Sequence, residues 1–134
     1  MTIDDTIAAY ESMYFDASKN KSIYEGLKND YVNLNNSLGS YSNHVNSALD
    51  FIFGAGSDCE NGGFISGTQI LGGDLIYDIQ GDLEKSLESL RELNTFCLTK
   101  IQEYEQKVYY YQLRMTSYSI TINNLKSRKR KWKW

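Results

Sequence analysis

The chain has 134 residues, a length that suits one domain, and it contains no proline. Six of its 14 basic residues follow Leu125, so residues 1–125 carry 8 basic and 17 acidic groups. This excess of negative charge repels phosphate and argues against nucleic acid as a partner of residues 1–125. No apolar run is long enough to span a membrane, and Asp4 and Asp5 stand where a signal peptide is basic, so we expect a soluble, cytoplasmic protein.

The first predicted element is a helix over residues 2–53. Steps of three and four residues from Ile3 to Ile52 select apolar side chains at every position except Thr6 and Asn20. A stripe that repeats every seven residues is typical of a coiled-coil helix, and we call it the first seam. The first seam includes Leu27, Tyr31, Leu34, Leu38, Tyr41 and Val45.

The second predicted element is a loop over residues 54–73. It holds seven of the ten glycines and several turn-forming polar residues. Cys59 lies in this loop and Cys97 lies far along the next helix, so the two cysteines are too distant to form a disulfide. We therefore expect free thiols, with Cys97 buried and Cys59 accessible.

The third predicted element is a helix over residues 74–126, which begins in an acidic stretch between Asp74 and Asp82. The same three-and-four stepping from Ile76 to Leu125 selects apolar side chains at all but two positions, Gln80 and Asn94. We call this stripe the second seam. It includes Leu90, Ile101, Tyr104, Val108 and Met115.

Two seams of equal length predict an all-α fold, a long antiparallel two-helix hairpin that is coiled-coil-like and has a glycine-rich central loop. We expect residues 1–125 to form a single domain. A hairpin folded about residue 64 places Asn20 opposite Val108 and Asn94 opposite Leu34, so neither asparagine pairs with the other.

The predicted tail, residues 127–134, mixes cations with Trp132 and Trp134. This composition can hold anionic lipid or nucleic acid. The alternative is a basic terminus that complements the helix dipole, and we favour this second interpretation. Contact between the tail and a membrane surface stays open as an alternative.

The residue types that enzymes use are sparse and scattered. His44 is the only histidine and lies outside the first seam, and Cys59 has no second ligand at metal-binding spacing. No Gly-Lys-Ser or Gly-Lys-Thr follows the glycines, so they do not form a phosphate loop. We predict no catalytic, cofactor-binding or metal-binding residues, no cofactor and no small-molecule substrate, and hence a protein that is not an enzyme.

The chain has more apolar side chains than one stripe per helix can bury. Tyr109, Tyr110 and Tyr111 span most of the helix circumference, so at least one must face outward, and Ile7 also lies off its seam. Large exposed aromatics mark interfaces, which predicts that the hairpin completes a helical bundle with a partner or a second copy. The candidate partner-binding residues are Phe96, Tyr109, Tyr110, Leu113, Ile120, Tyr14 and Phe15.

Two long helices, an interruption with glycines and aromatics, and no catalytic residues resemble the WXG superfamily of ESAT-like small helical proteins in Gram-positive type VII secretion. The closer likeness is to YwqH-like partners of LXG toxins. The nearest counterparts of the family's Trp-x-Gly turn are residues 51–54 and 63–67, and its export signal, a tyrosine followed four residues later by an acid, is absent.

That resemblance implies a cytoplasmic targeting factor or chaperone that binds the helical N-terminal LXG domain of a toxin, with or without a second small helical protein, and that is co-secreted or retained. Two alternatives remain. One is a homo-oligomeric coiled-coil structural or adaptor protein, and the other is a nucleic-acid or membrane-surface binder that acts through the basic tail.

Overall fold

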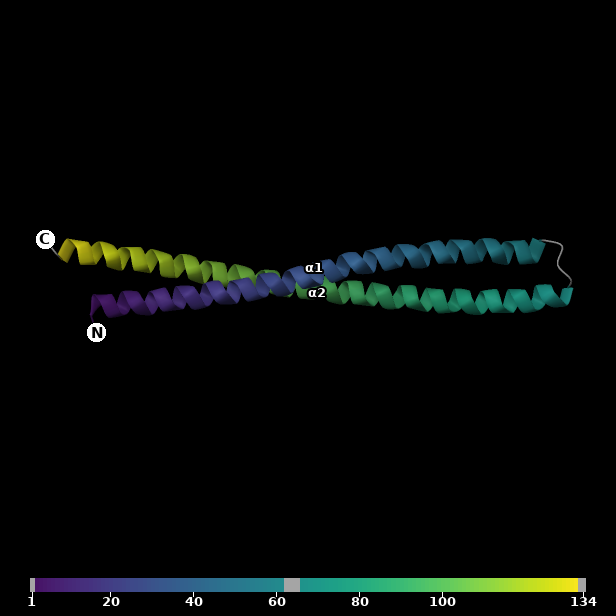
Figure 1. Cartoon of the computed structure of the whole chain (residues 1–134), viewed down its shortest axis with the longest axis horizontal. Coiled ribbons are helices and arrows are strands. Elements are labelled where there is room, and N and C mark those ends of the chain that lie inside the picture. The colour runs from purple at the N-terminus through teal and green to yellow at the C-terminus, as the bar shows by residue number, and fades with distance from the viewer. Residues whose placement is uncertain (1, 62–65, 133–134) are drawn as a thin grey trace. The chain divides into compact units, whose positions relative to one another are not determined.

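The computed structural model describes residues 2–61 and 66–132. Within them the chain forms two α-helices, α1 (Ile3–Asn61) and α2 (Ser66–Trp132), and no strand (Figure 1). The fold is therefore the all-α helical hairpin that the two seams predicted. In these residues neither helix contains a segment that is long and apolar enough to cross a membrane.

Both helices extend into the segment that we expected to form the central loop. α1 continues past residue 53 to Asn61, and α2 begins at Ser66 instead of between Asp74 and Asp82. Each glycine lowers helix stability by about 1 kcal/mol, but without proline every backbone N–H can still donate within the helix. The expected loop of residues 54–73 is corrected accordingly. Residues 62–65 and the side chain of Cys59 lie outside the described part.

α2 also continues beyond its expected end at residue 126. Its last turn contains Lys129, Arg130 and Lys131, and cations at this position complement the negative end of the helix dipole. Most of the predicted tail is therefore helix. Residues 133–134 and the side chain of Trp132 lie outside the described part.

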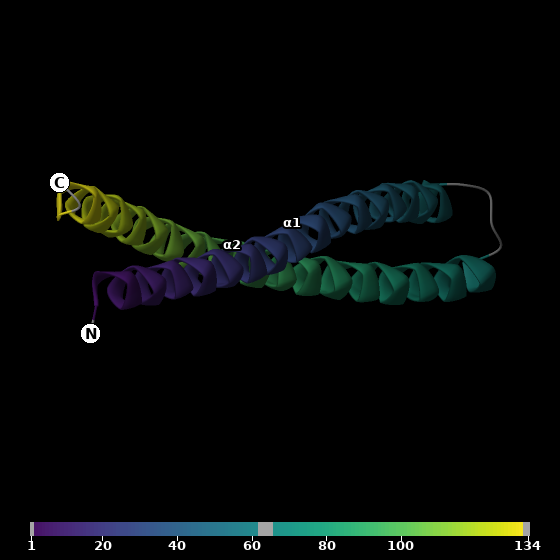
Figure 2. The same cartoon turned by 60° about the vertical axis from the view of Figure 1, so that its left-hand side comes forward.

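The chain packs as two compact units. Unit 1 combines Met1–Val32 with Thr99–Trp134, and unit 2 is Asn33–Leu98. In each unit a segment of α1 lies beside an antiparallel segment of α2, and in unit 1 the start of α1 and the end of α2 lie at the same end (Figure 2).

Tyrosine rings from the two helices meet along the centre of unit 1. Tyr24 stacks on Tyr111 with ring centroids 5.8 Å apart and an interplanar angle of 14°, and it also contacts Tyr104 at 5.8 Å. Tyr31 contacts Tyr104 from the other side at 5.8 Å. The tyrosines of the two predicted seams thus pack against one another, as core residues do.

Polar pairs join the same two helix segments. Lys28 Nζ lies 3.2 Å from Glu105 Oε1, and Lys21 Nζ donates to Gln112 Oε1 at 2.7 Å. The two lysines are seven residues apart on α1, and Glu105 and Gln112 are seven residues apart on α2. The pairs therefore repeat regularly, and we call them the polar ladder. Such exposed pairs stabilise a protein by at most about 1 kcal/mol each. Their main effect is therefore on the register between α1 and α2, and their contribution to stability is small.

The register of unit 1 differs from a fold about residue 64. Both pairs of the polar ladder are centred between residues 66 and 67. In consequence Asn20 lies beside Tyr110 and Tyr111 instead of opposite Val108, and it lines an open groove. Asn94, the other asparagine of the two seams, is exposed.

In unit 2 the buried stripe of α1 is rotated relative to the first seam. Leu38 stays buried, but Leu49 joins it, while Leu34 and Tyr41 are 46% and 60% exposed. A straight helix drifts by about 20° per heptad relative to an exact seven-residue repeat, so alternate seam positions turn outward. The placement of Leu34 and Tyr41 in the seam was therefore wrong.

The other named seam residues lie at the packed side of their helices. Cys97 is fully buried with a free thiol, as expected. Ile7, which we expected to lie off the seam, is also buried. The half-buried members are Leu27, Tyr31, Val45, Leu90, Ile101, Tyr104, Val108 and Met115.

Candidate protein-binding surface

All seven candidate partner-binding residues are exposed. Phe96 belongs to unit 2 and the other six belong to unit 1, so they do not form one patch. Exposure alone does not test whether these residues bind a partner, so their role in binding stays a prediction. The seven are Phe96, Tyr109, Tyr110, Leu113, Ile120, Tyr14 and Phe15.

Three of them form a stripe on α2 in unit 1. Tyr109, Leu113 and Ile120 are 66%, 51% and 57% exposed. They follow one another at spacings of four and seven residues, which at 3.6 residues per turn places them along one line of the helix. By the same geometry this line lies opposite the second seam. We call these three residues the outer stripe.

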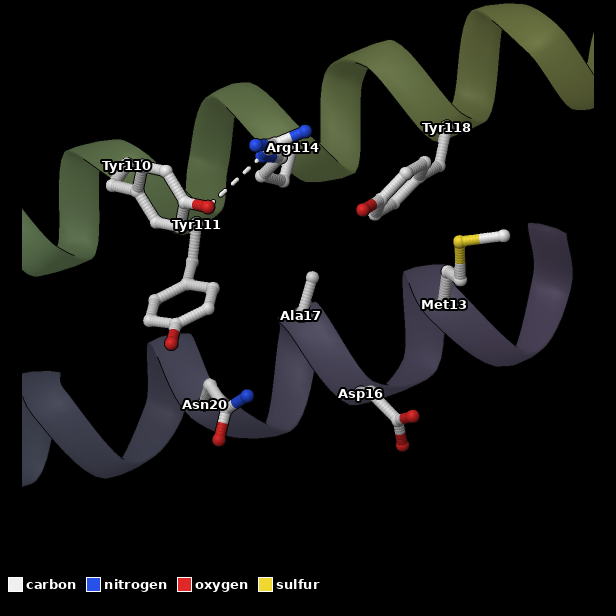
Figure 3. A pocket seen from close by; sticks show the side chains of 8 residues that line it. All are labelled: Met13, Asp16, Ala17, Asn20, Tyr110, Tyr111, Arg114 and Tyr118. Carbon is white, nitrogen blue, oxygen red and sulfur yellow. Dashed lines mark hydrogen bonds between the residues drawn. The ribbon is translucent and has the colours of Figure 1, made fainter.

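Tyr110 lies at the edge of an open groove between α1 and α2 (Figure 3). The groove has a volume of about 300 Å³. The methyl group of Ala17 points into it, and the carboxylate of Asp16 points away from α2 (Figure 3). The lining residues are Met13, Asp16, Ala17, Asn20, Tyr110, Tyr111, Arg114 and Tyr118.

The ring of Tyr110 is held in place although nearly half of the residue is exposed. Arg114 Nε donates to the Tyr110 hydroxyl at 3.2 Å, and its guanidinium carbon lies 5.2 Å from the ring centroid (Figure 3). The hydrogen bond to Tyr110 raises the pKa of Arg114 above its usual value. On the other side the ring meets Tyr111 edge-on, with centroids 5.1 Å apart. A ring fixed in this way loses little conformational freedom when a partner covers it.

Tyr14 lines a second groove of about 250 Å³, and it interrupts the polar ladder. Tyr14 precedes Lys21 by seven residues, and Ser119 follows Gln112 by seven, so these two residues occupy the next rung. The rung therefore contains no ion pair, and the groove beside it is lined by Met115 and Ile120 as well as by Gln112, Thr116 and Ser119. Ile120 lines this groove and also belongs to the outer stripe, so the two features are continuous.

Two candidates lie apart from these features. Phe15 is exposed on α1 and lines neither groove, and Phe96 is exposed on α2 in unit 2. The contact of Arg114 with Tyr110 was missed at the sequence level, although their spacing of four residues on a helix is a signal that could have found it.

Across residues 2–54 and 74–131, whose side chains are described, no group of three His, Cys, Asp or Glu residues is placed to hold a metal ion. His44 is exposed on α1.

No protein-family model matches the chain, and no curated protein and no solved structure matches it. The resemblance to the WXG superfamily thus stays an expectation. The exposed apolar surface of unit 1 is the observation from which a function can be proposed.

Proposed function

We propose that the protein is a non-enzymatic binding factor for another helical protein. In the more specific form of the proposal it is a targeting factor or chaperone that binds the helical LXG domain of a toxin for export by a type VII secretion system. The observation that carries the proposal is the outer stripe of Tyr109, Leu113 and Ile120, together with the adjoining groove at Tyr14.

The size of the exposed apolar surface supports a protein partner. A fully buried side chain of this kind contributes about 1.5 to 3 kcal/mol, so three half-exposed side chains offer a few kcal/mol on further burial. Association costs more than that in lost freedom of motion. A partner must therefore also cover neighbouring surface, which an extended helix or helix pair does.

The arrangement of that surface supports a helical partner. The outer stripe is linear and one side chain wide, which suits the ridges of another helix. A helix packed there would extend the hairpin toward a three- or four-helix bundle, the usual way in which such hairpins bury a second apolar face.

The experiment combines the purified protein with the helical N-terminal domain of an LXG toxin from the same host. The test variant carries Tyr110→Lys and Leu113→Lys, and the matched control carries Asn43→Lys and Asn46→Lys, two exposed positions of unit 2 with the same spacing and the same added charge. We expect the wild type and the control to bind equally, and the test variant to bind at least tenfold more weakly with unchanged helical circular dichroism.

Two results would contradict the proposal at different levels. If no LXG domain binds the wild type, the assignment to toxin export is wrong. If the domain binds the test variant as well as it binds the wild type, the surface of unit 1 is not the binding surface. Sedimentation of the wild type alone checks one of the two alternatives, the homo-oligomeric coiled coil.

A further inference from the structure

One position in the tyrosine packing of unit 1 carries no ring. Between residues 10 and 31 of α1, every seventh residue along the side that faces α2 is a tyrosine, with the exception of Ala17. Each tyrosine of this row contacts one or two tyrosine rings of α2. Ala17 is buried in the same row but offers only a methyl group. The tyrosines of the row are Tyr10, Tyr24 and Tyr31.

The contacts on either side show which space the missing ring leaves. Tyr24 stacks on Tyr111, and Tyr10 packs against Tyr118 with ring centroids 6.1 Å apart. By the same seven-residue step, a ring at position 17 would lie between Tyr111 and Tyr118. Both of these rings line the groove of about 300 Å³ into which the Ala17 methyl group points (Figure 3). The groove therefore lies where the row lacks a tyrosine, and we call this place the Ala17 hole.

The Ala17 hole suits one large apolar side chain. Its groove has about ten times the ~30 Å³ that a water molecule occupies in the liquid, which leaves room for a ring as large as that of phenylalanine. Aromatic rings pair favourably at centroid distances of about 4.5 to 7 Å, so Tyr111 and Tyr118 offer partners on both sides. In coiled coils the side chain of one helix enters a hole of this kind in the facing helices.

The walls of the groove carry opposite charge. Arg114 lies on the α2 wall, and Asp16 lies on the α1 wall with its carboxylate pointing away from α2, so the two do not neutralise each other (Figure 3). A helix along the groove has two edges, and it can present an acid to Arg114 and a base to Asp16. An anionic lipid headgroup matches only one of these charges. The charges therefore favour a helix as the occupant.

We infer that a helix of the partner protein lies in this groove, places one aromatic side chain in the Ala17 hole, and carries an acidic residue on the edge that faces Arg114. The inference rests on the proposed function and adds the point at which the partner is fixed along the hairpin. Tyr110 borders the groove and is a neighbour of Leu113 on the surface of α2, so one partner can cover both the groove and the outer stripe.

The experiment uses the full-length protein and two designed helical peptides with a fluorescent label for anisotropy. The peptides differ only at one central position, which is phenylalanine in one and alanine in the other, and both carry glutamate and lysine on opposite edges. We expect the phenylalanine peptide to bind at least tenfold more tightly, because buried aromatic anchors dominate the energy of such interfaces. Equal binding of the two peptides would overturn the inference.

Filling the hole from within tests its position. Ala17→Tyr supplies the missing ring and should weaken the binding of the phenylalanine peptide at least tenfold, with unchanged helical circular dichroism. The matched control is Ala8→Tyr, at an exposed position that lies on the opposite side of α1 at 3.6 residues per turn, and it should bind like the wild type. Undiminished binding by folded Ala17→Tyr would overturn the inference, and the peptide pair decides the question on the wild type if this variant does not fold.

Charge reversal tests the α2 wall. Arg114→Glu should weaken the binding of the phenylalanine peptide by about threefold, as loss of an exposed ion pair does. The control is Arg91→Glu at an exposed position of unit 2, which should leave the binding unchanged. Equal effects of the two reversals would show that the peptide responds to net charge, and the acidic edge assigned to the partner would be wrong.

Two further readouts separate the outcomes. If the wild type self-associates in sedimentation, Ala17→Tyr abolishes this and neither peptide binds, a second copy fills the Ala17 hole and the inference is wrong. If the LXG domain binds the wild type and Ala17→Tyr equally well, the proposed function stands and the inference is wrong. Failure of the LXG domain to bind the wild type would instead refute toxin export, and the peptide pair still decides whether the hole accepts an aromatic side chain.

Discussion

At the scale of single residues, the side chain of Asn35 is unusual. It lies on the packed side of α1 in unit 2, and its Oδ1 is buried with no hydrogen-bond partner among the described residues. A buried polar atom without a partner costs about 1 to 3 kcal/mol, because it has given up water and received nothing in exchange. Asn35 therefore lowers the stability of the folded state.

We predict that Asn35→Leu stabilises the protein by about 1 to 2 kcal/mol, since it removes the unsatisfied oxygen and adds apolar contact. Urea unfolding followed by circular dichroism measures the change in the free energy of unfolding. The control is Asn36→Leu at the exposed neighbouring position, which should change it by less than about 0.5 kcal/mol. Destabilisation by Asn35→Leu would mean that the oxygen has a partner in solution.

The start of α1 is closed by a reciprocal pair of hydrogen bonds. The backbone N–H of Thr2 donates to Asp5 Oδ2 at 3.0 Å, and the backbone N–H of Asp5 donates to Thr2 Oγ1 at 3.1 Å. This is a capping box with Thr2 at the N-cap. The bonds from Thr2, the backbone one first, lower the pKa of the Asp5 carboxyl below 3.8.

A lowered pKa in the folded state has a defined consequence for stability. The cap stabilises the helix at pH values above the unfolded pKa of Asp5, and the effect is lost as the pH falls through the folded pKa. We predict that Thr2→Val moves the carboxyl titration of Asp5, followed by NMR, toward 3.8. Thr2→Ser retains the hydroxyl and should retain the lowered pKa. An unchanged titration in Thr2→Val would show that the Thr2 hydroxyl does not contribute to the lowered pKa.

At the scale of the helices, the second seam was predictable because it stays on the packed side of α2 throughout the described part, with Asn94 as its one exposed member. The first seam was predicted correctly in unit 2 at Leu38 and Val45 but not at Leu34 and Tyr41, because nothing in a regular heptad pattern reveals where a helix rotates by a fraction of a turn. The extent of the loop was misjudged for a different reason. Glycine weakens a helix without forbidding it, so a cluster of glycines cannot set a helix end by itself.

The register between the helices depends on individual side chains that periodicity does not specify. Tyr24 of α1 contacts both Tyr104 and Tyr111, which are seven residues apart on α2. A fold about residue 64 gives a register that differs by five residues from that of the pair of Lys28 and Glu105, and it would separate Tyr24 from at least one of them.

We predict that Tyr24→Ala destabilises the protein by about 2 to 3 kcal/mol, since it removes a half-buried ring and two aromatic contacts. Tyr41→Ala makes the same substitution on the same helix at an exposed position and should cost less than about 1 kcal/mol. Thermal unfolding of the two variants provides the comparison. Equal losses would show that Tyr24 is no more packed than Tyr41 and that the register described for unit 1 is incorrect.

At the scale of the whole molecule, the two units carry opposite charge. Unit 1 contains 12 basic and 8 acidic residues, and unit 2 contains 2 basic and 9 acidic residues. An acidic partner would be attracted to unit 1 and repelled by unit 2, so for such a partner charge favours the unit that also carries the outer stripe. The exposed apolar residues of unit 2, Phe96 among them, lack this advantage.

The charge difference leads to a prediction about where a bound partner protects the backbone. A ligand present at 100 times its dissociation constant stabilises the state it binds by about 2.7 kcal/mol, and this gain slows hydrogen exchange only where opening would release the ligand. With an LXG domain bound, we expect slower exchange at amides of α2 around Tyr109 to Ile120, and little change around Phe96. The variant with Tyr110→Lys and Leu113→Lys should lose the added protection at equal LXG concentration, while the variant with Asn43→Lys and Asn46→Lys should keep it. Protection centred on Phe96 would place the partner on unit 2, and the outer stripe would then be exposed for a reason other than binding this partner.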